Sequence, residues 1–494
     1  MRMGEMLVSR GLVDPRDMEA ALRRQQVKGG RLHDNLIAMG LLSEVELAAV
    51  MDSAPVVPAA LGETGVLERN LLALMLKFML LEGCETVVGL ADRMKLPSRI
   101  ITQLLDEAAQ QRFVQSMGAA SGGMTLSIRY TLSDQGRAVA KDALEHNMYV
   151  GPAPVSLTAY QEQIQKQRIS NEMLDADAVR RSFDDLVVPD DCVRRLLPAV
   201  SAGRSLLLFG ASGNGKSTLA MRIGAIFRDV VYIPYAVEIG GQIMTVFDPS
   251  VHKPIVTDEA AAVPTGLGGS ARKAFDQRWV PCLRPMVVAG GEFTLEKLEL
   301  QFSSNARFYD APLHVKALNG VFLLDDFGRQ KFSPDTLLNR WIVPMESQVD
   351  YLTLSTGASF ALPFDVLLIF STNLNPSDLM DPAFLRRIQY KIKLFPPSFD
   401  EYWRIFDNVA SSHGLELTDD IFEYVIDRLG EAGLAYYQPK FICEHVIEAC
   451  RCLKWAPQLT VELVAEALAN LYFDIADAGN PLAPVAFSPA ALAT

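Results

Sequence analysis

The sequence predicts an α/β fold built around a parallel sheet. Three apolar runs, each the length of one strand, predict this fold, and they occupy residues 205–209, 320–324 and 365–370. Runs of this kind are typical of parallel strands that helices cover on both faces. A segment with polar side chains follows each run, and ligands bind at the carboxyl ends of parallel strands. A functional site is therefore expected at that edge of the sheet.

Length and composition indicate an ordinary globular protein of several domains. The chain has 494 residues, of which 49% are apolar and 21% charged. Its net charge of −13 argues against broad, non-specific contact with nucleic acid or anionic membranes. The six cysteines lack C-x-x-C spacing, and the most apolar run, residues 71–81, is too short to span a bilayer. We expect a cytoplasmic protein without membrane insertion.

Residues 1–55 contain an internal repeat. Each copy begins at an arginine, Arg2 or Arg31, and reads as a short helix, a glycine break and a second helix. The two copies resemble the N-terminal domain of type II secretion and type IV pilus assembly ATPases, the MshEN type. Some members of that family bind cyclic di-GMP through this paired motif. The resemblance implies a regulatory dinucleotide site in the first 55 residues.

Four residues of this repeat match the family's ligand-binding positions: Arg2, Gly4, Gln25 and Arg31. The arginine fork suits phosphate and guanine edges, and glycine allows the backbone to approach a ligand. The second copy departs from the motif, since His33 replaces the glycine and Ala54 stands in place of the glutamine. A helical module that docks a protein and binds no nucleotide is the alternative.

A domain of helices and one hairpin is expected at 66–147, after a linker rich in Pro, Ala and Gly at 53–65. Three helical patterns, at residues 67–81, 87–94 and 98–111, come first. Two strand-like runs, at 113–117 and 124–132, and a last helix at 135–145 follow. The order resembles a winged helix-turn-helix domain, most closely in the RYTLSDQGRA run at 129–138.

DNA binding by this domain has little support from its charges. The candidate recognition helix carries Asp106 and Glu107 against Arg99 and Arg112, and the wing at 119–124 contains no Lys or Arg. Contact with a protein is the favoured interpretation, and DNA binding is the alternative. Residues 148–183 then read as a polar connector with one helix near 161–168.

The core at 184–400 opens with a glycine loop between a strand and a helix, with the sequence GASGNGKST. Its glycines allow the backbone to wrap a phosphate, with amides turned inward at a helix N-terminus. Lys216 is placed to reach the outer phosphates and Ser217 to ligate Mg²⁺. All nine residues are predicted to bind a nucleoside triphosphate: Gly210, Ala211, Ser212, Gly213, Asn214, Gly215, Lys216, Ser217 and Thr218.

Polar side chains follow the other two strands. Asp325 would hold magnesium and Asp326 would orient the attacking water, while Asn373 ends the third strand. Arg386 and Arg387 end a short helix. These motifs and the glycine loop resemble the AAA+ ATPase family. The resemblance implies that Asn373 is the sensor-1 residue, that Arg386 or Arg387 is the arginine finger, and that the site is completed in a ring, usually a hexamer.

Two features qualify the resemblance to AAA+ ATPases. Most members have Asp-Glu where this chain has Asp325-Asp326, and the shorter carboxylate favours slow or partner-dependent hydrolysis. Extra chain at 247–315, with strand-like pieces at 284–288 and 297–302, and a hairpin at 351–363 resemble the branch of MoxR-type ATPases, magnesium chelatases and enhancer-binding activators. The activators' GAFTGA loop is absent.

The last domain, 401–475, has four helical patterns at 401–411, 419–429, 439–453 and 461–474, as in the helical lid of AAA+ proteins. Lys440 lies near the sensor-2 position and could contact a phosphate as a point charge. Residues 476–494 read as a loose tail. Three functions remain open: an ATPase that remodels or positions a protein partner, a DNA-associated regulator that uses the winged helix, and a nucleotide-dependent scaffold with little turnover.

Overall fold

Five parallel strands form the central sheet, in the order β16-β4-β15-β12-β9. The computed structural model describes residues 7–8, 12–28, 32–43, 54–119, 128–172, 174, 176–255, 275–430 and 433–472. The strands are β16 Tyr390–Lys393, β4 Leu206–Phe209, β15 Val366–Thr372, β12 Gly320–Leu324 and β9 Met286–Ala289. The predicted α/β class with a parallel sheet is confirmed.

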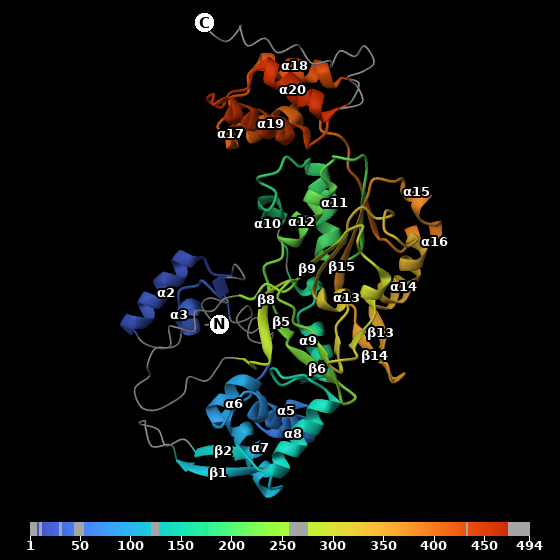
Figure 1. Ribbon diagram of the computed structural model, residues 1–494. Coiled ribbons are helices and arrows are strands. Elements are labelled where there is room, and N and C mark those ends of the chain that lie inside the picture. The colour runs from blue at the N-terminus through green and yellow to red at the C-terminus, as the bar shows by residue number, and fades with distance from the viewer. Residues whose placement is uncertain are drawn as a thin grey trace.

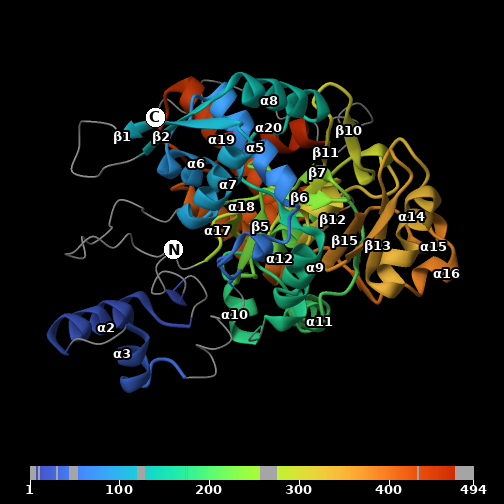
Figure 2. The ribbon, with the colours of Figure 1, turned by 90° about the horizontal axis from the view of Figure 1, so that it is seen from below.

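Alternate residues of each central strand pack on opposite faces of the sheet. In β12, Val321 and Leu323 pack with α11 (Asp190–Ser201) and α12 (Lys216–Gly224), whereas Phe322 and Leu324 pack with α14 (Pro334–Ser347). Figure 2 shows α12 and α14 on the two sides of the strands. Both faces are therefore buried, which explains the uninterrupted apolar runs.

The strand-like piece expected at 284–288 belongs to the central sheet. It forms the edge strand β9, which pairs in parallel with β12, so it is no part of an inserted hairpin. The piece expected at 297–302 is a 3-10 helix, η4 (Leu295–Leu298), followed by a short strand, β10 (Gln301–Ser303). The hairpin predicted at 351–363 is present, as β13 (Val349–Thr353) paired antiparallel with β14 (Ser359–Pro363).

A second sheet lies beside the central one, in the order β10-β11-β7-β6-β3. Its remaining strands are β11 Phe308–Asp310, β7 Gln242–Thr245, β6 Ala236–Ile239 and β3 Val155–Ser156, and a separate antiparallel ribbon pairs β5 Val230–Pro234 with β8 Trp279–Leu283. One core cluster contains side chains of the second sheet, the ribbon and one face of the central sheet. The two sheets are thus parts of one packed body.

The helical domain has the elements that the sequence predicts. They are α5 Glu68–Leu81, α6 Val87–Met94, α7 Ser98–Gln110, β1 Val114–Ala119, β2 Ile128–Leu132 and α8 Asp134–His146, with β1 and β2 antiparallel. Residues 120–127, which include most of the predicted wing, lie outside the described ranges. The buried Lys77 of α5 donates hydrogen bonds to Asn147 O (2.6 Å) and Asn147 Oδ1 (2.7 Å), and so holds the end of α8.

The linker before this domain packs closely against the segment that leads into β8. The buried Arg278, which pairs with Asp276, donates to Thr64 O (3.0 Å) and Pro154 O (3.1 Å). Asp276 N donates to Pro55 O, and Arg99 of α7 donates to Pro58 O at 3.0 Å. Side chains from the helical domain and from the body therefore hold the linker in one position.

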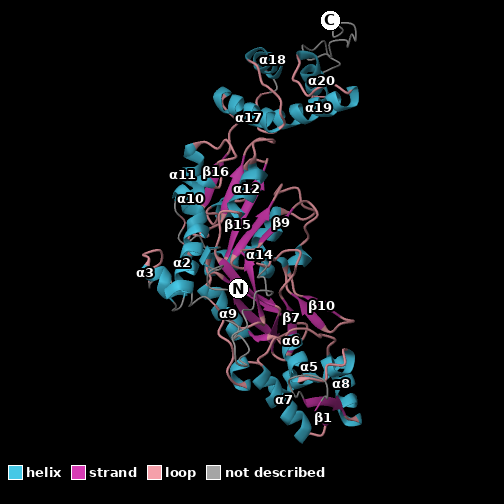
Figure 3. Ribbon diagram, turned by 90° about the vertical axis from the view of Figure 1, so that its left-hand side faces the viewer, coloured by secondary structure: helices cyan, strands magenta, loops and turns pink. Residues whose placement is uncertain are grey.

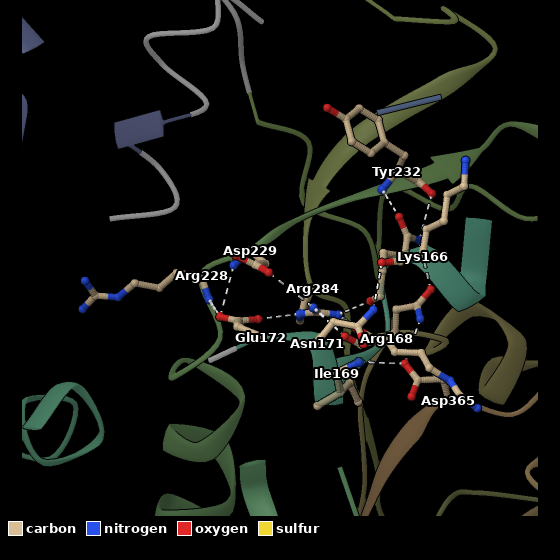
Figure 4. A network of polar contacts seen from close by, with 12 residues as sticks. Lys166, Arg168, Ile169, Asn171, Glu172, Arg228, Asp229, Tyr232, Arg284 and Asp365 are labelled. Atoms are coloured by element: carbon tan, nitrogen blue, oxygen red, sulfur yellow. Dashed lines mark hydrogen bonds and ion pairs between the residues drawn. The ribbon is translucent and has the colours of Figure 1, made fainter. Parts of the chain in front are cut away.

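Residues 148–183 differ from the polar connector that the sequence predicts. They contain β3, α9 (Leu157–Lys166), η2 (Ile169–Asn171) and α10 (Ala176–Arg181). Polar residues of this segment are buried in a network around Arg284, shown in Figure 4. Arg284 Nε pairs with Glu172 Oε2 at 2.7 Å, and Arg284 Nη1 donates to Gln167 O and Asn319 O at 2.8 Å. The side chain of Glu172, and that of Gln167 through bonds to Tyr232 and Asn319, therefore have partners inside the protein.

The N-terminal repeat forms a small separate core. It contains α2 (Pro15–Lys28) and α3 (Leu32–Ala38), which lie to one side of the body in Figures 1 and 3. Its buried side chains are Leu7, Val13, Met18, Ala21, Leu36 and Leu42. Gln25 lies on α2, whereas Arg2, Gly4 and Arg31 lie outside the described residues.

Four helices form the lid, at the end of the molecule opposite the helical domain (Figure 1). They are α17 Phe399–Ser412, α18 Asp419–Leu429, α19 Gln438–Leu453 and α20 Val461–Leu471, close to the four predicted patterns. A capping box of Ser398 and Glu401 begins α17. Across the described ranges, no helix is both long and apolar enough to cross a membrane. The predicted tail, 476–494, falls outside those ranges.

Candidate nucleotide-binding site

The glycine loop joins β4 to α12 at the carboxyl edge of the central sheet. Gly210, Gly213 and Gly215 have φ of 146°, 81° and 74°. Such values favour glycine. The atoms packed around Gly210 and Gly213 also leave no room for a Cβ. A Cβ on Gly210 would lie 2.3 Å from Leu394 O, and one on Gly213 would lie 2.5 Å from Cδ1 of Tyr437. The strand, loop and helix are those that the sequence predicts.

Lys216 begins α12 and points back over the loop. Its Nζ donates to Gly210 O at 3.0 Å and to Ala211 O at 2.8 Å. Burial lowers the pKa of Lys216, while the nearby carboxylates of Asp326 and Asp325 oppose this shift. The ammonium group is thus held in the loop, next to two negative charges, where phosphate oxygens of a bound nucleotide could reach it.

Ser217 brings the loop into contact with β12. Its Oγ donates to Asp325 Oδ1 at 2.9 Å, and Asp326 N donates to the same oxygen at 3.2 Å. A hydroxyl and a carboxylate side by side supply two oxygen ligands of the kind that Mg²⁺ prefers, with the remaining positions left to phosphate and water. No group of three or more His, Cys, Asp or Glu in the described residues could hold a metal. The residues present fit magnesium bound together with a nucleotide.

Asp326 lies at the turn after β12, with φ of 50°. A non-glycine residue in the left-handed region is uncommon and indicates a constrained turn. Asp326 Oδ1 accepts a hydrogen bond from Asn373 Nδ2 at 3.3 Å. Asn373 Oδ1 is buried and has no hydrogen-bond partner among the described residues. The two predicted residues therefore meet, and one polar atom between the strands is left to bind a ligand or water.

Gln330 supports this turn and was missed by the sequence analysis. Its Nε2 donates to Asp325 O at 3.1 Å, and its Oε1 accepts from Gly328 N at 2.9 Å. Both bonds fix the backbone that carries the two aspartates. A glutamine six residues after a strand has no distinctive sequence signal, so only the folded turn reveals this role.

A cavity of about 870 Å³ extends from the glycine loop to the lid. Its lining includes the polar residues Lys216, Ser217, Asp326 and Asn373. Apolar side chains that the sequence analysis did not select also line it: Leu186, Val188, Ile392, Ile405 and Val409. A lining of both kinds suits the phosphates and the base of a nucleotide.

The structure distinguishes the two adjacent arginines after α16 (Pro382–Leu385). Arg387 Nε pairs with Glu346 Oε1 at 2.6 Å, and Arg387 Nη1 donates to Ala383 O at 3.0 Å. Arg386 is exposed, and its side chain makes no hydrogen bond or ion pair with any described residue. Neither arginine lines the cavity. Of the two, Arg386 is the one available to another molecule.

Lys440 lines the lid side of the cavity, near the start of α19. Its side chain is 67% exposed and lies 3.7 Å from Glu444, a weak surface pair. Lys440 is therefore free to turn toward a ligand. Two lid tyrosines that were not predicted, Tyr436 and Tyr437, line the cavity beside it.

Comparisons with known proteins identify a family for the lid alone. Residues 398–470 match the model of a domain of unknown function, DUF8689. This range coincides with the four lid helices. No curated protein matches the chain. The matched range agrees with the bounds of the lid in the structure.

Several solved structures share similarity with part of the chain. The Thermotoga maritima RuvB Holliday junction branch migration motor is 14% identical, over 62% of this chain and 72% of that one, with a TM-score of 0.32. NtrX from Brucella abortus is 13% identical, over 65% and 59%, with a TM-score of 0.32. Domain III of the Thermotoga maritima replication initiation protein DnaA is 12% identical, over 60% and 98%, with a TM-score of 0.33. At such low identities and scores, we base the functional argument on the geometry of the site.

Proposed function

We propose that this chain is a magnesium-dependent ATPase of the AAA+ type. The contact between Ser217 Oγ and Asp325 Oδ1 carries the proposal, because it joins the glycine loop to the acidic end of β12. These two segments are 108 residues apart in sequence. A phosphate-binding loop beside a carboxylate pair supplies the parts that phosphoryl transfer requires.

Each polar residue of the site has a distinct role in this proposal. The loop amides and Lys216 bind the phosphates, and Ser217 and Asp325 hold the metal. Bound Mg²⁺ would neutralise charge on the outer phosphates. Asp326 orients the attacking water and accepts its proton. Asn373, which already contacts Asp326 at 3.3 Å, keeps that carboxylate directed toward the reacting phosphate.

The apolar side chains that line the cavity support a nucleotide as the ligand, in preference to inorganic phosphate. A base in the cavity could contact Val188, just before α11, and Ile405 of the lid. The ligand would thus bridge the core and the lid. ATP is the nucleotide that the resemblance to AAA+ ATPases favours.

We further propose that the site is completed by a second copy of the chain in a ring, as in AAA+ hexamers. Arg386 supports this proposal, because it is exposed, lacks a partner among the described residues and does not line its own chain's cavity. An arginine fork matches the oxygens of a phosphate and is always charged. In this proposal Arg386 acts on the neighbouring subunit's nucleotide, and Arg387 keeps its place by pairing with Glu346.

We propose a protein as the partner that the ATPase remodels or positions. The alternative, DNA binding through a winged helix, loses support because Arg99, one of two basic residues near the candidate recognition helix, donates to Pro58 O. Two exposed apolar residues, Met117 and Ile128, lie on the β1–β2 hairpin. Apolar exposed residues favour protein contact over phosphate contact.

Cyclic di-GMP regulation through the first 55 residues remains a proposal that rests on the resemblance to MshEN domains. Its proposed contacts are Arg2, Gly4, Gln25 and Arg31. A scaffold with little turnover is the remaining alternative, because Asp326 is one methylene shorter than the usual glutamate.

The direct test of the proposed function is phosphate release with Mg²⁺ and ATP. Lys216→Ala should abolish release, because the variant lacks the charge that binds the outer phosphates. Lys141→Ala changes an exposed lysine of α8 and provides the matched control. Release by Lys216→Ala at the wild-type rate would refute the proposal, and ATP binding without release by the wild type would favour the scaffold.

A further inference from the structure

The lid touches the glycine loop directly. Tyr436 N donates to Gly213 O at 3.1 Å. A Cβ on Gly213 would lie 2.5 and 2.6 Å from two ring carbons of Tyr437, so this ring packs against the bare backbone of the loop. We call residues 433–438, which carry the two tyrosines, the lid strap. The lid strap therefore contacts the loop that we propose binds the phosphates of the nucleotide.

The lid strap is braced from within the lid. Gln438, which is buried, accepts a hydrogen bond from Ala435 N at 2.7 Å and donates to Gly433 O at 2.9 Å. The same amide donates to the hydroxyl of Tyr472, at the end of α20. The Gln438 side chain thus makes hydrogen bonds within the lid strap and to the end of the last lid helix. These bonds should keep the strap in the same conformation whether or not it contacts the glycine loop.

A second contact fixes the loop from the core side. Asn214 Nδ2 donates to Leu394 O at 3.0 Å, and Leu394 N donates to Phe209 O at 2.8 Å. The peptide group between Gly213 and Asn214 is therefore held at both ends, by the lid strap and by the segment after β16. Because a trans peptide is planar, fixing Gly213 O also fixes the direction of Asn214 N–H. That N–H is one of the amides that such a loop offers to phosphate.

We propose that Tyr436 and Tyr437 are positioning residues that hold the glycine loop in its phosphate-binding shape. The inference rests on the proposed nucleotide site and adds that lid docking and nucleotide binding are linked. If lid docking shapes the loop for its ligand, the ligand must in turn favour lid docking, because such coupling is reciprocal. The loop amides cradle the inner phosphates. The coupling should therefore act on ADP and ATP alike, in contrast to a contact with the γ-phosphate.

The full chain with single substitutions at Tyr437 tests this inference. Tyr437→Ala removes the ring, Tyr437→Phe keeps it, and Phe399→Ala removes another exposed lid aromatic that does not line the cavity. Calorimetry with Mg-ADP and with a non-hydrolysable ATP analogue measures both affinities. We expect Tyr437→Ala to weaken both by roughly tenfold, as for loss of one well-packed aromatic contact. Tyr437→Phe should recover most of this loss, and Phe399→Ala should bind as the wild type does.

Turnover separates positioning from catalysis. Tyr437→Ala should raise KM by about the same factor, with kcat at saturating ATP within roughly twofold of the wild type, because the reacting groups are untouched. Equal affinities in the wild type and Tyr437→Ala would overturn the inference. Weaker binding of the ATP analogue alone would also overturn it, because that result indicates a γ-phosphate contact. Failure of the wild type to bind either nucleotide would instead refute the proposed function.

A double-mutant cycle with Gly213→Ala gives an independent test. The added Cβ meets the Tyr437 ring, but it also strains the loop because Gly213 has a φ of 81°. Only the first effect depends on Tyr437. Gly213→Ala should therefore weaken Mg-ADP binding by a larger factor in the wild-type background than in the Tyr437→Ala background. Equal factors in the two backgrounds would show that the ring and the loop are not coupled.

Discussion

Ser217 donates a 2.9 Å hydrogen bond to Asp325, and this single contact joins the glycine loop to the acidic end of β12. The segments that carry the two residues follow strands that are not neighbours, since β15 lies between β4 and β12 in the sheet. Their contact requires the loop to bend back across the sheet edge. The pair is well placed to bind a divalent cation together with phosphate oxygens.

The first prediction concerns this metal pair. Ser217→Ala and Asp325→Ala should each remove the part of nucleotide affinity that depends on Mg²⁺, because each lacks one oxygen ligand. Titration of a fluorescent ATP analogue with Mg²⁺ and with EDTA measures that part. Ser217→Thr keeps the hydroxyl and is the matched control, so it should retain the dependence on Mg²⁺. A response of Ser217→Ala to EDTA equal to that of the wild type would contradict the assignment.

The second prediction concerns the shorter carboxylate. Asp326→Asn should bind ATP as the wild type does and release no phosphate, because an amide cannot accept the water's proton. Asp326→Glu restores the length found in most AAA+ proteins, and it should raise turnover if the short side chain limits the rate. Single-turnover release of phosphate measures both effects. Turnover of Asp326→Asn at the wild-type rate would show that another group acts as the base.

The third prediction concerns Arg386. Arg386→Ala should lower turnover on the order of 10³-fold, as for the loss of an arginine finger. Arg387→Ala should retain most turnover, because Arg387 pairs with Glu346 of its own chain.

Mixing subunits shows whether Arg386 acts on a neighbour. A mixture of Arg386→Ala and Lys216→Ala chains should regain hydrolysis, since each mixed interface of the right polarity combines an intact loop with an intact arginine. No recovery in mixtures that form rings by analytical sizing would argue against a shared site.

The fourth prediction concerns pH and the buried lysine of the helical domain. Burial lowers the pKa of Lys77 from 10.5 to about 8. Between these two values the unfolded chain binds more protons than the folded one, so the free energy of unfolding should rise with pH. Below about pH 8 both states carry the proton, and the cost of burying the charge is fully present.

Lys77→Met tests this dependence, because methionine fills a similar volume without a charge. Urea denaturation between pH 7 and 10 measures the free energy of unfolding of both proteins. Above pH 8, that of the wild type should rise relative to that of Lys77→Met by up to ~1.4 kcal/mol per pH unit. Lys141→Met, at an exposed position of α8, should leave the dependence unchanged. Equal pH dependence of the wild type and Lys77→Met would contradict the prediction.

The fifth prediction concerns the N-terminal repeat. Calorimetry of the full chain with cyclic di-GMP should show binding that Arg2→Ala weakens, because charge-assisted hydrogen bonds are roughly twice as strong as neutral ones. His33→Gly should strengthen binding by restoring the glycine of the second copy. Arg16→Ala, at an exposed position of α2, is the matched control. No heat at tens of micromolar protein would favour a protein-docking module instead.

Local sequence patterns predicted the parts of the fold that are determined by residues close together in the sequence. The strands around Leu207 and Phe322 and the lid helices follow from apolar runs and helical periodicity, and the glycine loop follows from its motif. The second sheet was not predicted, because its strands are only two to four residues long and pair across distant segments. Polar residues such as Gln167 and Glu172 make residues 148–183 resemble a connector, yet Glu172 pairs with Arg284 and the amide of Gln167 bonds Tyr232 and Asn319 inside the protein.

The sequence predicted the motif residues of the candidate site, but not the contacts that depend on packing between distant segments. Lys216, Ser217, Asp325 and Asn373 are set by motifs that end strands or begin a helix, so their contacts could be anticipated. The choice of Arg386 over Arg387 depends on Glu346, which lies on α14. The contact of Tyr436 with Gly213 depends on how the lid packs on the core. No local pattern contains information of that kind.

The buried pair of Arg284 and Glu172 limits where this protein can be cut. A fragment beginning at residue 184, where the sequence predicts that the nucleotide-binding core starts, would keep the Arg284 guanidinium and lose the Glu172 carboxylate. Removing one partner of a buried ion pair costs about 3–5 kcal/mol, a large share of the stability of an ordinary domain. Arg278 would lose its acceptors Thr64 O and Pro154 O in the same fragment. The smallest piece expected to fold by itself therefore begins before Pro55. A fusion of another protein to residue 184 would lack these partners and should be unstable.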